Sequence, residues 1–310
     1  MAIAQPMVLY RILDYFFLLR PSVLIPCWTT LLLGHQYAHG TMLSRDFPVQ
    51  AFLLYSAVMG GSYILNQLFD IESDRKNKKL FLLSGNLVPI WAARVEMIFL
   101  WSLGTALAWQ YQPSFRLLVI ISLLLGILYS LPPVKLKGRP IADLVSNSLG
   151  YGLVSFLVGY TVSRTLSIDA VKHAMPYVLA VGGVFVNTTI VDLEGDRTAG
   201  AMTTAVLLGR RAAYVLALLL IVGSLVTAAG FGNYPCLITS ILSLPLFVVA
   251  LLKQDRKWTT ASFRVPPALL ALIAGLFYPI YLILLAVLLL GMRLYYKRRF
   301  GYDYPKVAEP

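Results

Sequence analysis

Cysteine, histidine and acidic residues are scarce in this chain of 310 residues, which contains 2 Cys, 3 His and 14 Asp or Glu. Cys27 and Cys236 lie in or beside apolar segments and have no CxxC or histidine partner. That pattern excludes a disulfide framework and argues against a zinc site. Only 13% of the residues are charged, 58% are hydrophobic, and the mean hydropathy is +0.75. A soluble domain does not have this composition, so we predict a multi-pass integral membrane protein.

Basic residues outnumber acidic ones, and 26 Lys and Arg give a net charge of +12. They sit mainly in short loops between apolar runs. Retention of positive loops on the cytoplasmic side explains this placement better than nucleic-acid binding does, so we expect no nucleic-acid partner. The loops after the second, fourth, sixth and eighth apolar segments are the most basic and are predicted to be cytoplasmic.

A transmembrane helix needs about 20 mostly apolar residues. The chain offers nine such segments, at about 14–37, 49–69, 88–109, 114–132, 140–163, 173–192, 211–231, 234–252 and 267–292. Pro279 is expected to kink the last one. We therefore predict an all-α bundle of about nine transmembrane helices with a central cavity, filling residues 1–310 as a single domain. In a bacterium it would lie in the inner or plasma membrane.

An acidic motif closes the second and the sixth apolar segments. It reads D-I-E-S-D-R at residues 70–75 and D-L-E-G-D-R at residues 192–197, an offset of 122 residues. If the helix that begins near residue 50 continues through the first copy, Asn66, Asp70 and Asp74 lie on one face. The repeat predicts two four-helix units, about 14–137 and 140–264, followed by a last helix over 267–292. A cavity would lie between the two aspartate faces.

Carboxylates gathered on an apolar wall require cations. Aspartates spaced i, i+4 supply hard oxygen ligands and leave room for water and phosphate, which is how proteins usually hold Mg²⁺. We therefore expect Mg²⁺ to bridge Asp70, Asp74, Asp192 and Asp196 to a diphosphate; solvated charges at helix ends are the alternative. Further positive charge for the same anion is expected from Arg75 and Arg197, which end the two copies of the motif, together with Lys79, Lys135 and Lys137.

Residues 129–138 read Y-S-L-P-P-V-K-L-K-G. The prolines are expected to stop the fourth helix and to force an extended crossing that holds Tyr129 and the two lysines near the cytoplasmic mouth. An ordinary proline-rich connector is the alternative. Asp143 and Asn147, spaced i, i+4 at the start of the fifth segment, either extend the polar face into an acceptor cavity or form a structural hydrogen bond between helices.

These motifs together resemble the UbiA superfamily of intramembrane prenyltransferases. The family signatures N-x-x-x-D-x-x-x-D and D-x-x-x-D match Asn66, Asp70, Asp74, Asp192 and Asp196. The Y-S-x-P-P-x-K-x-K loop matches residues 129–137, and E-G-D-R-x-x-G matches residues 194–200. Lys-Asp, which several quinone-pathway members carry before the second motif, is replaced by Thr188-Thr189, so the acceptor class stays open.

The resemblance implies a nine-helix bundle with a cavity open laterally to lipid, and Mg²⁺ on the two aspartate motifs. Asn66 would support the first metal or the diphosphate, and Tyr129, Lys135 and Lys137 would contact the diphosphate. Ionisation of a polyprenyl diphosphate would give an allylic carbocation. A lipophilic or aromatic acceptor would then capture it: a quinone precursor, a chlorin or a prenylated glycerophosphate.

A transporter or cation pathway that uses the paired aspartates is the alternative function. It would place ionisable residues near the middle of the membrane and discontinuous helices at matching positions. Both acidic motifs instead lie at predicted helix ends on one side of the membrane. That placement favours the enzyme.

Overall fold

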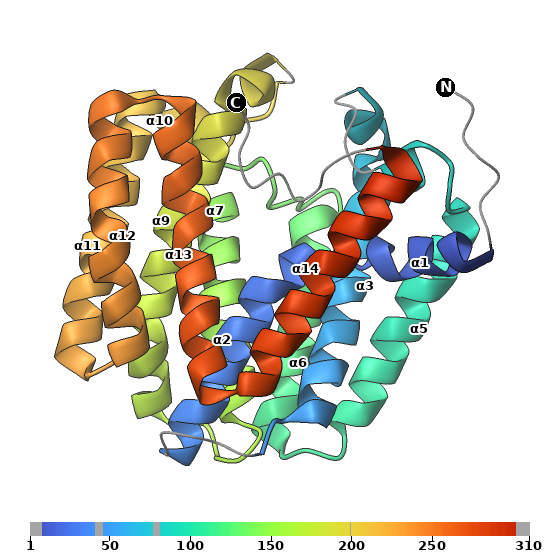
Figure 1. Cartoon of the computed structure of the whole chain (residues 1–310), viewed down its shortest axis with the longest axis horizontal. Helices are drawn as coiled ribbons and strands as arrows, with labels where there is room; N and C mark the ends of the chain where they lie inside the picture. Colours follow the sequence, from blue (N-terminus) through green and yellow to red (C-terminus); the bar gives the residue numbers. More distant parts are fainter. Residues whose placement is uncertain (1–7, 41–45, 77–80, 199, 302–310) are drawn as a thin grey trace.

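The computed structural model describes residues 8–40, 46–76, 81–198 and 200–301, and every regular element in these ranges is a helix (Figure 1). The elements in chain order are α1 (Val8–Leu18), α2 (Pro21–His39), α3 (Val49–Lys76), α4 (Phe81–Ser84), α5 (Ile90–Ala108), α6 (Pro113–Ser130), α7 (Ala142–Asn147), the π-helix η1 (Ser148–Val154), α8 (Ser155–Tyr160), α9 (Ile168–Thr198), α10 (Thr204–Leu208), α11 (Arg210–Phe231), α12 (Tyr234–Lys253), α13 (Arg256–Phe277) and α14 (Pro279–Phe300). The predicted all-α class is confirmed.

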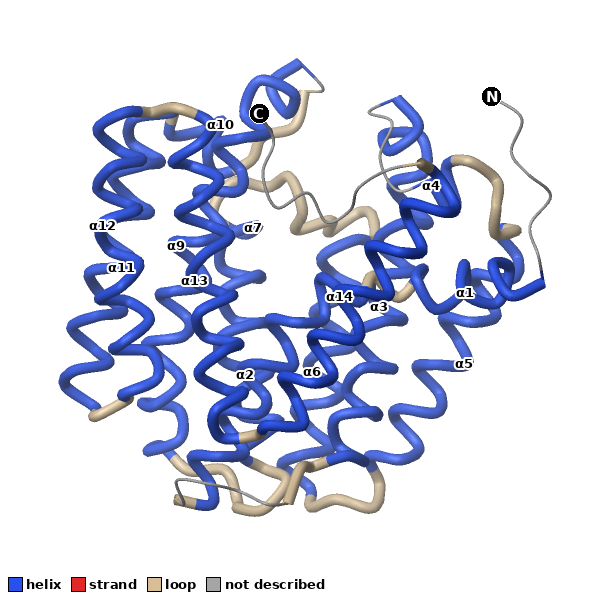
Figure 2. Tube along the Cα trace, viewed as in Figure 1, coloured by secondary structure: helices blue, strands red, loops and turns tan. Residues whose placement is uncertain are grey.

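Seven of the described helices are long and apolar enough to cross a membrane, and the pair α1 and α2, bent by 49°, raises the number to eight. Helix α3 ends in the charged motif, and the stretch from α7 to α8 is divided among three short helices. The chain is thus a multi-pass membrane protein, while the count of nine and the internal repeat stay predictions. Loops join the helices at both ends of the bundle (Figure 2).

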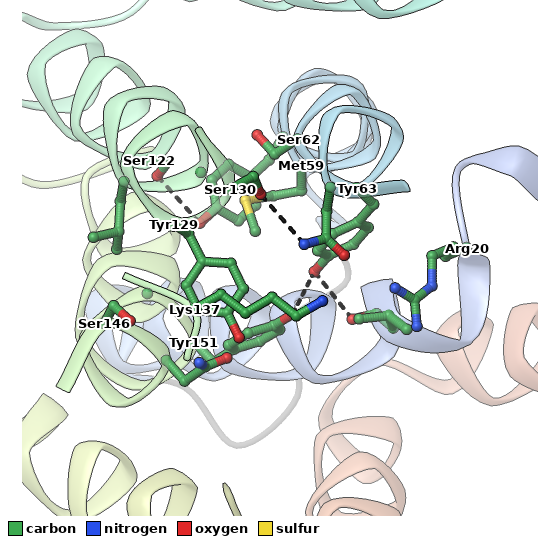
Figure 3. A pocket seen from close by; sticks show the side chains of 17 residues that line it. Arg20, Met59, Ser62, Tyr63, Ser122, Tyr129, Ser130, Lys137, Ser146 and Tyr151 are labelled. Atoms are coloured by element: carbon green, nitrogen blue, oxygen red, sulfur yellow. Dashed lines mark hydrogen bonds between the residues drawn. The ribbon is translucent and has the colours of Figure 1, made fainter. Parts of the chain in front are cut away.

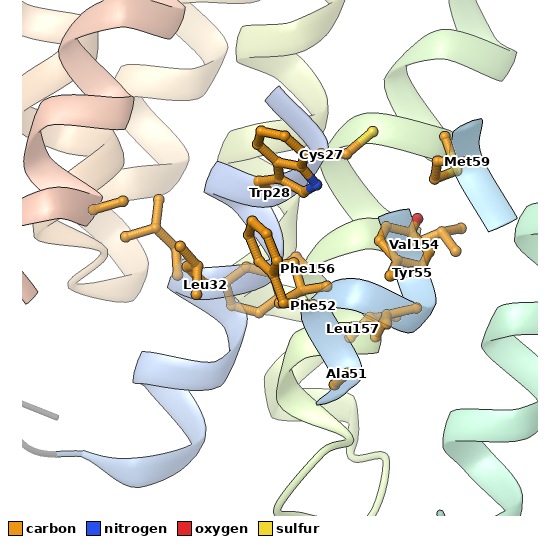
Figure 4. Close-up of a cluster of buried hydrophobic side chains, with 14 of the residues drawn as sticks. Cys27, Trp28, Leu32, Ala51, Phe52, Tyr55, Met59, Val154, Phe156 and Leu157 are labelled. Atoms are coloured by element: carbon orange, nitrogen blue, oxygen red, sulfur yellow. The ribbon is translucent and has the colours of Figure 1, made fainter. Parts of the chain in front are cut away.

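Helices α2 and α8 pack with their backbones in direct contact. A Cβ atom at Gly34 would lie 1.9 Å from the carbonyl oxygen of Phe156, and one at Gly159 would lie 1.8 Å from that of Leu31. Small residues permit such close packing in membranes, where lipid offers no hydrophobic drive for helix association. Buried side chains of α2, α3, η1 and α8 form an apolar cluster around this contact (Figure 4).

The predicted last helix over 267–292 is wrong. The chain turns back at Tyr278, whose φ of −127° and ψ of 83° are not helical, and Pro279 begins α14 instead of kinking a continuous helix. Proline suits this first position because the backbone N–H that it lacks has no partner there. Figure 1 shows α14 returning to the face where α3 and α9 end, so its basic end, residues 297–299, lies on the face of both acidic motifs.

A buried ion pair joins the first and last helices. The Asp14 side chain, in a residue that is 1% exposed, accepts hydrogen bonds from Arg299 Nη2 at 2.9 Å and from the Tyr295 hydroxyl. The predicted first segment over 14–37 is divided at Arg20-Pro21, where α1 ends and α2 begins. Asp14 therefore ties the end of α14 to a helix that precedes this break.

Helices α7, η1 and α8 run without interruption from Ala142 to Tyr160, with one π-helical segment between the two α-helical ones. Next to it, the Ser155 hydroxyl donates to the Gly150 carbonyl at 2.8 Å. Single π-helical turns are frequent at functional sites. Gly150 and Tyr151, both in η1, line the cavity described below.

Candidate active site

The first acidic motif lies on the last turns of α3, which is continuous from Val49 to Lys76. The premise that Asn66, Asp70 and Asp74 share one helical face is therefore confirmed. Asp70 is 8% exposed, and its Oδ2 contacts Lys137 Nζ. Asn66 Nδ2 donates to Ser130 Oγ at 3.3 Å. Ser130 ends α6, and Lys137 lies in the loop that follows it.

That loop folds back over the end of α6, so the predicted extended crossing is wrong. The backbone N–H groups of Lys135, Leu136 and Lys137 donate to carbonyls of the last turn of α6 and of Leu131, at 2.8–3.0 Å. Lys135 takes a positive φ of 36° and points an exposed side chain away from this packing. The turn thereby separates the two lysines, because only Lys137 reaches Asp70.

The second acidic motif lies on the last turns of α9. Asp196 is half-buried, and its Oδ2 accepts a hydrogen bond from the Thr203 hydroxyl at 3.2 Å. Asp192 is exposed and lines a separate polar cavity of about 270 Å³ together with Arg210, Tyr214 and Arg256. The structure therefore places the two aspartates of this motif in different surroundings.

A cavity of about 260 Å³ lies between α2, α3, α6 and the α7–η1 stretch (Figure 3). We call it the polar cavity, because most of the residues that line it carry a polar group. Four predicted site residues line it: Asn66, Tyr129, Lys137 and Asn147. Tyrosine and serine side chains supply most of the remaining polar wall, namely Tyr55, Tyr63, Tyr151, Ser62, Ser122, Ser130 and Ser146. Lys137 connects this wall to Asp70 at its edge.

The tyrosine hydroxyls of this wall are engaged in hydrogen bonds. Tyr63 Oη lies 2.9 Å from Tyr151 Oη and donates to the Val23 carbonyl at 3.2 Å. Tyr55 Oη lies 2.9 Å from Ser155 Oγ. The hydroxyls are thus held by protein groups, which fixes the orientation of the rings.

A third cavity, of about 410 Å³, lies between α2, η1, α9, α12 and α13, and we call it the apolar cavity. Its wall includes Ala180, Val184 and Phe185 of α9, with Thr188 one turn before Asp192. Four residues line both the polar and the apolar cavity: Arg20, Val23, Asn147 and Tyr151. The polar and the apolar cavity are therefore neighbours that share one wall. An amphiphilic molecule can occupy both if the side chains of that wall move aside.

Arg20 is a site residue that the sequence reasoning did not identify. It occupies the break between α1 and α2 with a left-handed backbone, φ 53° and ψ 63°, and its side chain lines both cavities. Figure 3 shows Arg20 and Lys137 reaching the polar cavity from opposite sides. The signal available in sequence was a lone arginine inside an apolar run, directly before a proline that can start a helix.

The remaining predicted cations have contacts elsewhere or fall outside the described ranges. Arg75 Nε donates to the Ser84 carbonyl at 3.1 Å, and Arg197 lies 4.0 Å from Glu194 on the exposed surface of α9. Lys79 is not among the described residues. Glu194 also lies 3.4 Å from Arg210, as expected of a solvated carboxylate. The diphosphate roles of Arg75 and Arg197 stay predictions.

Asp143 and Asn147 differ in their surroundings. Asn147 lines both the polar and the apolar cavity, and its Nδ2 donates to the Asp143 carbonyl at 2.8 Å. Asp143 is 1% exposed, and its carboxylate accepts hydrogen bonds from Leu144 and Thr204. Of the two readings of Asp143, these contacts favour the structural hydrogen bond.

The donor set fits Mg²⁺. Both acidic motifs offer only oxygen ligands, and no group of three or more His, Cys, Asp or Glu within the described ranges is arranged to hold a metal by itself. Mg²⁺ is commonly held by one or two carboxylates, with waters and substrate phosphates completing its six ligands. Each motif can therefore supply a part of such a shell.

These features place Lys137 and Arg20 at a cavity that shares a wall with an apolar cavity. The chain belongs to the UbiA prenyltransferase family, whose sequence model matches residues 23–265. It is thus an intramembrane prenyltransferase, as its motifs predicted.

Relatives of this chain are named for different activities. Digeranylgeranylglyceryl phosphate synthase of Sulfurisphaera tokodaii is 27% identical over 250 residues, covering 78% of this chain and 88% of that protein. Homogentisate phytyltransferase of Synechocystis sp. is 26% identical over 210 residues, covering 65% and 68%. A UbiA homologue from Archaeoglobus fulgidus, solved with GPP and Mg²⁺, matches with a TM-score of 0.66 and 22% identity, covering 88% of this chain and 100% of that chain. That likeness shows the fold.

Proposed function

We propose that this protein transfers a prenyl group from a polyprenyl diphosphate to a lipophilic or aromatic acceptor, with Mg²⁺ and with its site on the cytoplasmic face. One observation carries the proposal. The polar cavity has basic side chains, Lys137 and Arg20, on opposite sides, and it shares a wall with an apolar cavity. A diphosphate fits the first environment and a prenyl chain fits the second.

The diphosphate would lie near Lys137 and Arg20. Lysine binds phosphate as a point charge and arginine through its fork of N–H donors, so the two residues hold different oxygens. Asp70, Asp74, Asp192 and Asp196 would hold Mg²⁺, with Asn66 beside them. Bound there, Mg²⁺ neutralises the charge that develops on the departing diphosphate.

The prenyl chain would lie along the apolar cavity of α9, α12 and α13. Burial of its methyl and methylene groups contributes about 0.8 kcal/mol per CH₂, which favours binding without a specific polar contact. The shared wall, with Val23 and Tyr151, would then lie near the carbon that is bonded to the diphosphate. This geometry orients the reactive end toward the polar cavity.

The carbon–oxygen bond breaks with its electron pair on the diphosphate and leaves an allylic carbocation. Aromatic ring faces attract cations, and Tyr55, Tyr63 and Tyr151 line the cavity where that cation forms. Their hydroxyls are engaged by protein groups, which opposes capture of the cation by a tyrosine oxygen. The acceptor forms the new bond and loses a proton.

The acceptor would place its polar group against the serine and tyrosine wall of the 260 Å³ cavity. The relatives support more than one class, since one is named for a glyceryl phosphate and another for homogentisate. Family membership argues against the transporter alternative. We therefore propose the three acceptor classes for direct test: aromatic quinone precursors, chlorins and prenylated glycerophosphates.

The test uses purified protein in nanodiscs with radiolabelled farnesyl and geranylgeranyl diphosphates and one acceptor of each class. We expect Mg²⁺-dependent product that is lost in Asp70→Ala and Asp192→Ala. Glu194→Ala is the matched control, because this exposed carboxylate lies two residues from Asp192 and pairs with surface arginines. If no acceptor reacts, Mg²⁺-dependent binding of the diphosphates that both variants lose supports an untested acceptor. Absence of binding overturns the proposal.

A further inference from the structure

Asp143 is among the most buried carboxylates of the described chain, and three donors surround it. Its Oδ1 accepts from the Leu144 N–H at 2.7 Å and from the Thr204 hydroxyl, and its Oδ2 accepts from the Thr204 N–H at 2.9 Å. The residue is 1% exposed and lines none of the three cavities described above. A buried carboxylate with this many donors fixes the positions of the backbone groups that it binds.

The Thr204 side of this contact leads to the second acidic motif. The neighbouring residue, Thr203, donates its hydroxyl to Asp196 Oδ2 at 3.2 Å. The Ala201 N–H donates to the Asp196 carbonyl at 2.9 Å, which closes the end of α9. Residues 201–204 therefore touch Asp196 at one end and are held by Asp143 at the other.

The other side of Asp143 leads to the first motif. Its carbonyl accepts from Asn147 Nδ2 at 2.8 Å, and Asn147 lines the polar cavity together with Tyr129 and Lys137. The Tyr129 carbonyl accepts the Lys137 N–H at 3.0 Å, and Lys137 contacts Asp70. Asp143 thus lies between the two acidic motifs: its contacts with Thr204 lead through Thr203 to Asp196, and its contact with Asn147 leads to the cavity wall that Lys137 joins to Asp70.

Strained backbone beside Asp143 indicates that this arrangement is maintained at a cost. Ile141 has φ 69° and ψ −45°, although it is β-branched and its side chain is 59% exposed. Such a conformation is unfavourable for a β-branched residue and persists only where the surroundings impose it. The Ile141 N–H donates to Thr204 Oγ1 at 2.8 Å, so the hydroxyl that Asp143 binds also holds the strained residue.

We propose that Asp143 is a positioning residue. It holds the loop after the second acidic motif, residues 201–204, against the loop that carries Lys137, so that both acidic motifs meet one diphosphate. The inference rests on the proposed function, since it names how the two motifs of that site are brought into register. Asp143 itself touches no substrate. Its effect reaches Asp196 through Thr203 and Thr204.

The test measures binding of geranylgeranyl diphosphate in nanodiscs as Mg²⁺ is titrated. Removal of a group that orients metal ligands typically costs 10- to 100-fold in metal affinity, so we expect at least a ten-fold rise in half-saturating Mg²⁺ for Asp143→Asn. Asp14→Asn is the matched control. Asp14 is equally buried at 1% exposure and holds α1 to α14. Its loss should lower thermal stability and change half-saturating Mg²⁺ by less than about two-fold.

If Asp143→Asn does not fold, a second pair of variants tests the positioning role of Asp143. Thr204→Ser keeps the hydroxyl and should bind Mg²⁺ as the wild type does, whereas Thr204→Val removes it and should need at least ten-fold more Mg²⁺. The positioning role alone is refuted, and the proposed function stands, if the wild type binds the diphosphate but the half-saturating Mg²⁺ of Asp143→Asn equals that of Asp14→Asn and that of Thr204→Val equals that of Thr204→Ser. A wild type that binds no diphosphate refutes the proposed function together with this inference.

Discussion

Replacing Lys137 by methionine tests the centre of the proposed site. The substitution keeps an unbranched side chain that is one heavy atom shorter, and it removes the charge that contacts Asp70. Loss of one group that stabilises a developing anion in a buried site typically lowers the rate by about 10²–10³-fold. The Lys137 side chain is 40% exposed, so water and salt screen part of its field, and the lower end of that range applies.

We therefore expect kcat/KM of Lys137→Met to fall by about 100-fold, which corresponds to about 2.7 kcal/mol of transition-state stabilisation. The measurement is transfer from geranylgeranyl diphosphate in nanodiscs at saturating Mg²⁺. Lys135→Met is the matched control, because Lys135 lies two residues earlier in the same loop and its side chain is exposed. It should stay within about three-fold of the wild type, as surface charges contribute little.

Two results would refute this reasoning. One is a Lys137→Met protein that retains activity within about three-fold of the wild type, since the contact with Asp70 would then be incidental. The other is an equal loss in Lys135→Met, which would show that the net charge of the loop acts without regard to the position of each lysine.

Other predictions concern affinity, packing and chain length. Arg20→Gln should weaken binding of the prenyl diphosphate by about ten-fold or more, measured by titration, because a charged donor that lines both cavities is lost. Gly34→Ala should lower the unfolding temperature in detergent, since its Cβ would lie 1.9 Å from a carbonyl oxygen; Gly230→Ala, which meets no atom within 4 Å, should not. Ala180→Phe should fill part of the apolar cavity and raise KM for geranylgeranyl diphosphate more than KM for dimethylallyl diphosphate; equal changes would contradict the placement of the chain. Chelation of Mg²⁺ by EDTA should abolish transfer, and added Mg²⁺ should restore it.

The helices that carry the acidic motifs could be predicted because their signals are local. The apolar run before Asp70 and the i, i+4 spacing of the aspartates lie within one helix, and α3 and α9 extend through both motifs. The end of the chain shows the limit of this reasoning. A proline in an apolar run either kinks a helix or begins a new one, and Pro279 does the second because Tyr278 leaves the helical conformation.

The contacts that assemble the site could not be predicted in the same way. Lys137 and Asp70 are 67 residues apart, and Asp143 and Thr204 are 61 apart, so both contacts depend on how whole helices pack. Lys135 and Lys137 look equivalent in sequence. In the structure Lys135 is exposed and has a positive φ, whereas Lys137 contacts Asp70. Arg20 was missed because a charge beside a proline also marks an ordinary helix boundary.

The π-helical segment η1 gives the cavity wall an unusual tolerance to a change of length. An α-helix that loses one residue rotates everything beyond the deletion by about 100°, because it has 3.6 residues per turn. A π-helical turn already contains one residue more than an α-helical turn. Deleting one residue between Ser148 and Val154 would therefore convert η1 to α-helix and leave α7 and α8 in phase, while it changes the segment that carries Tyr151 in the wall of both cavities. Relatives that differ by one residue here would keep the bundle and change the shape of the substrate chamber.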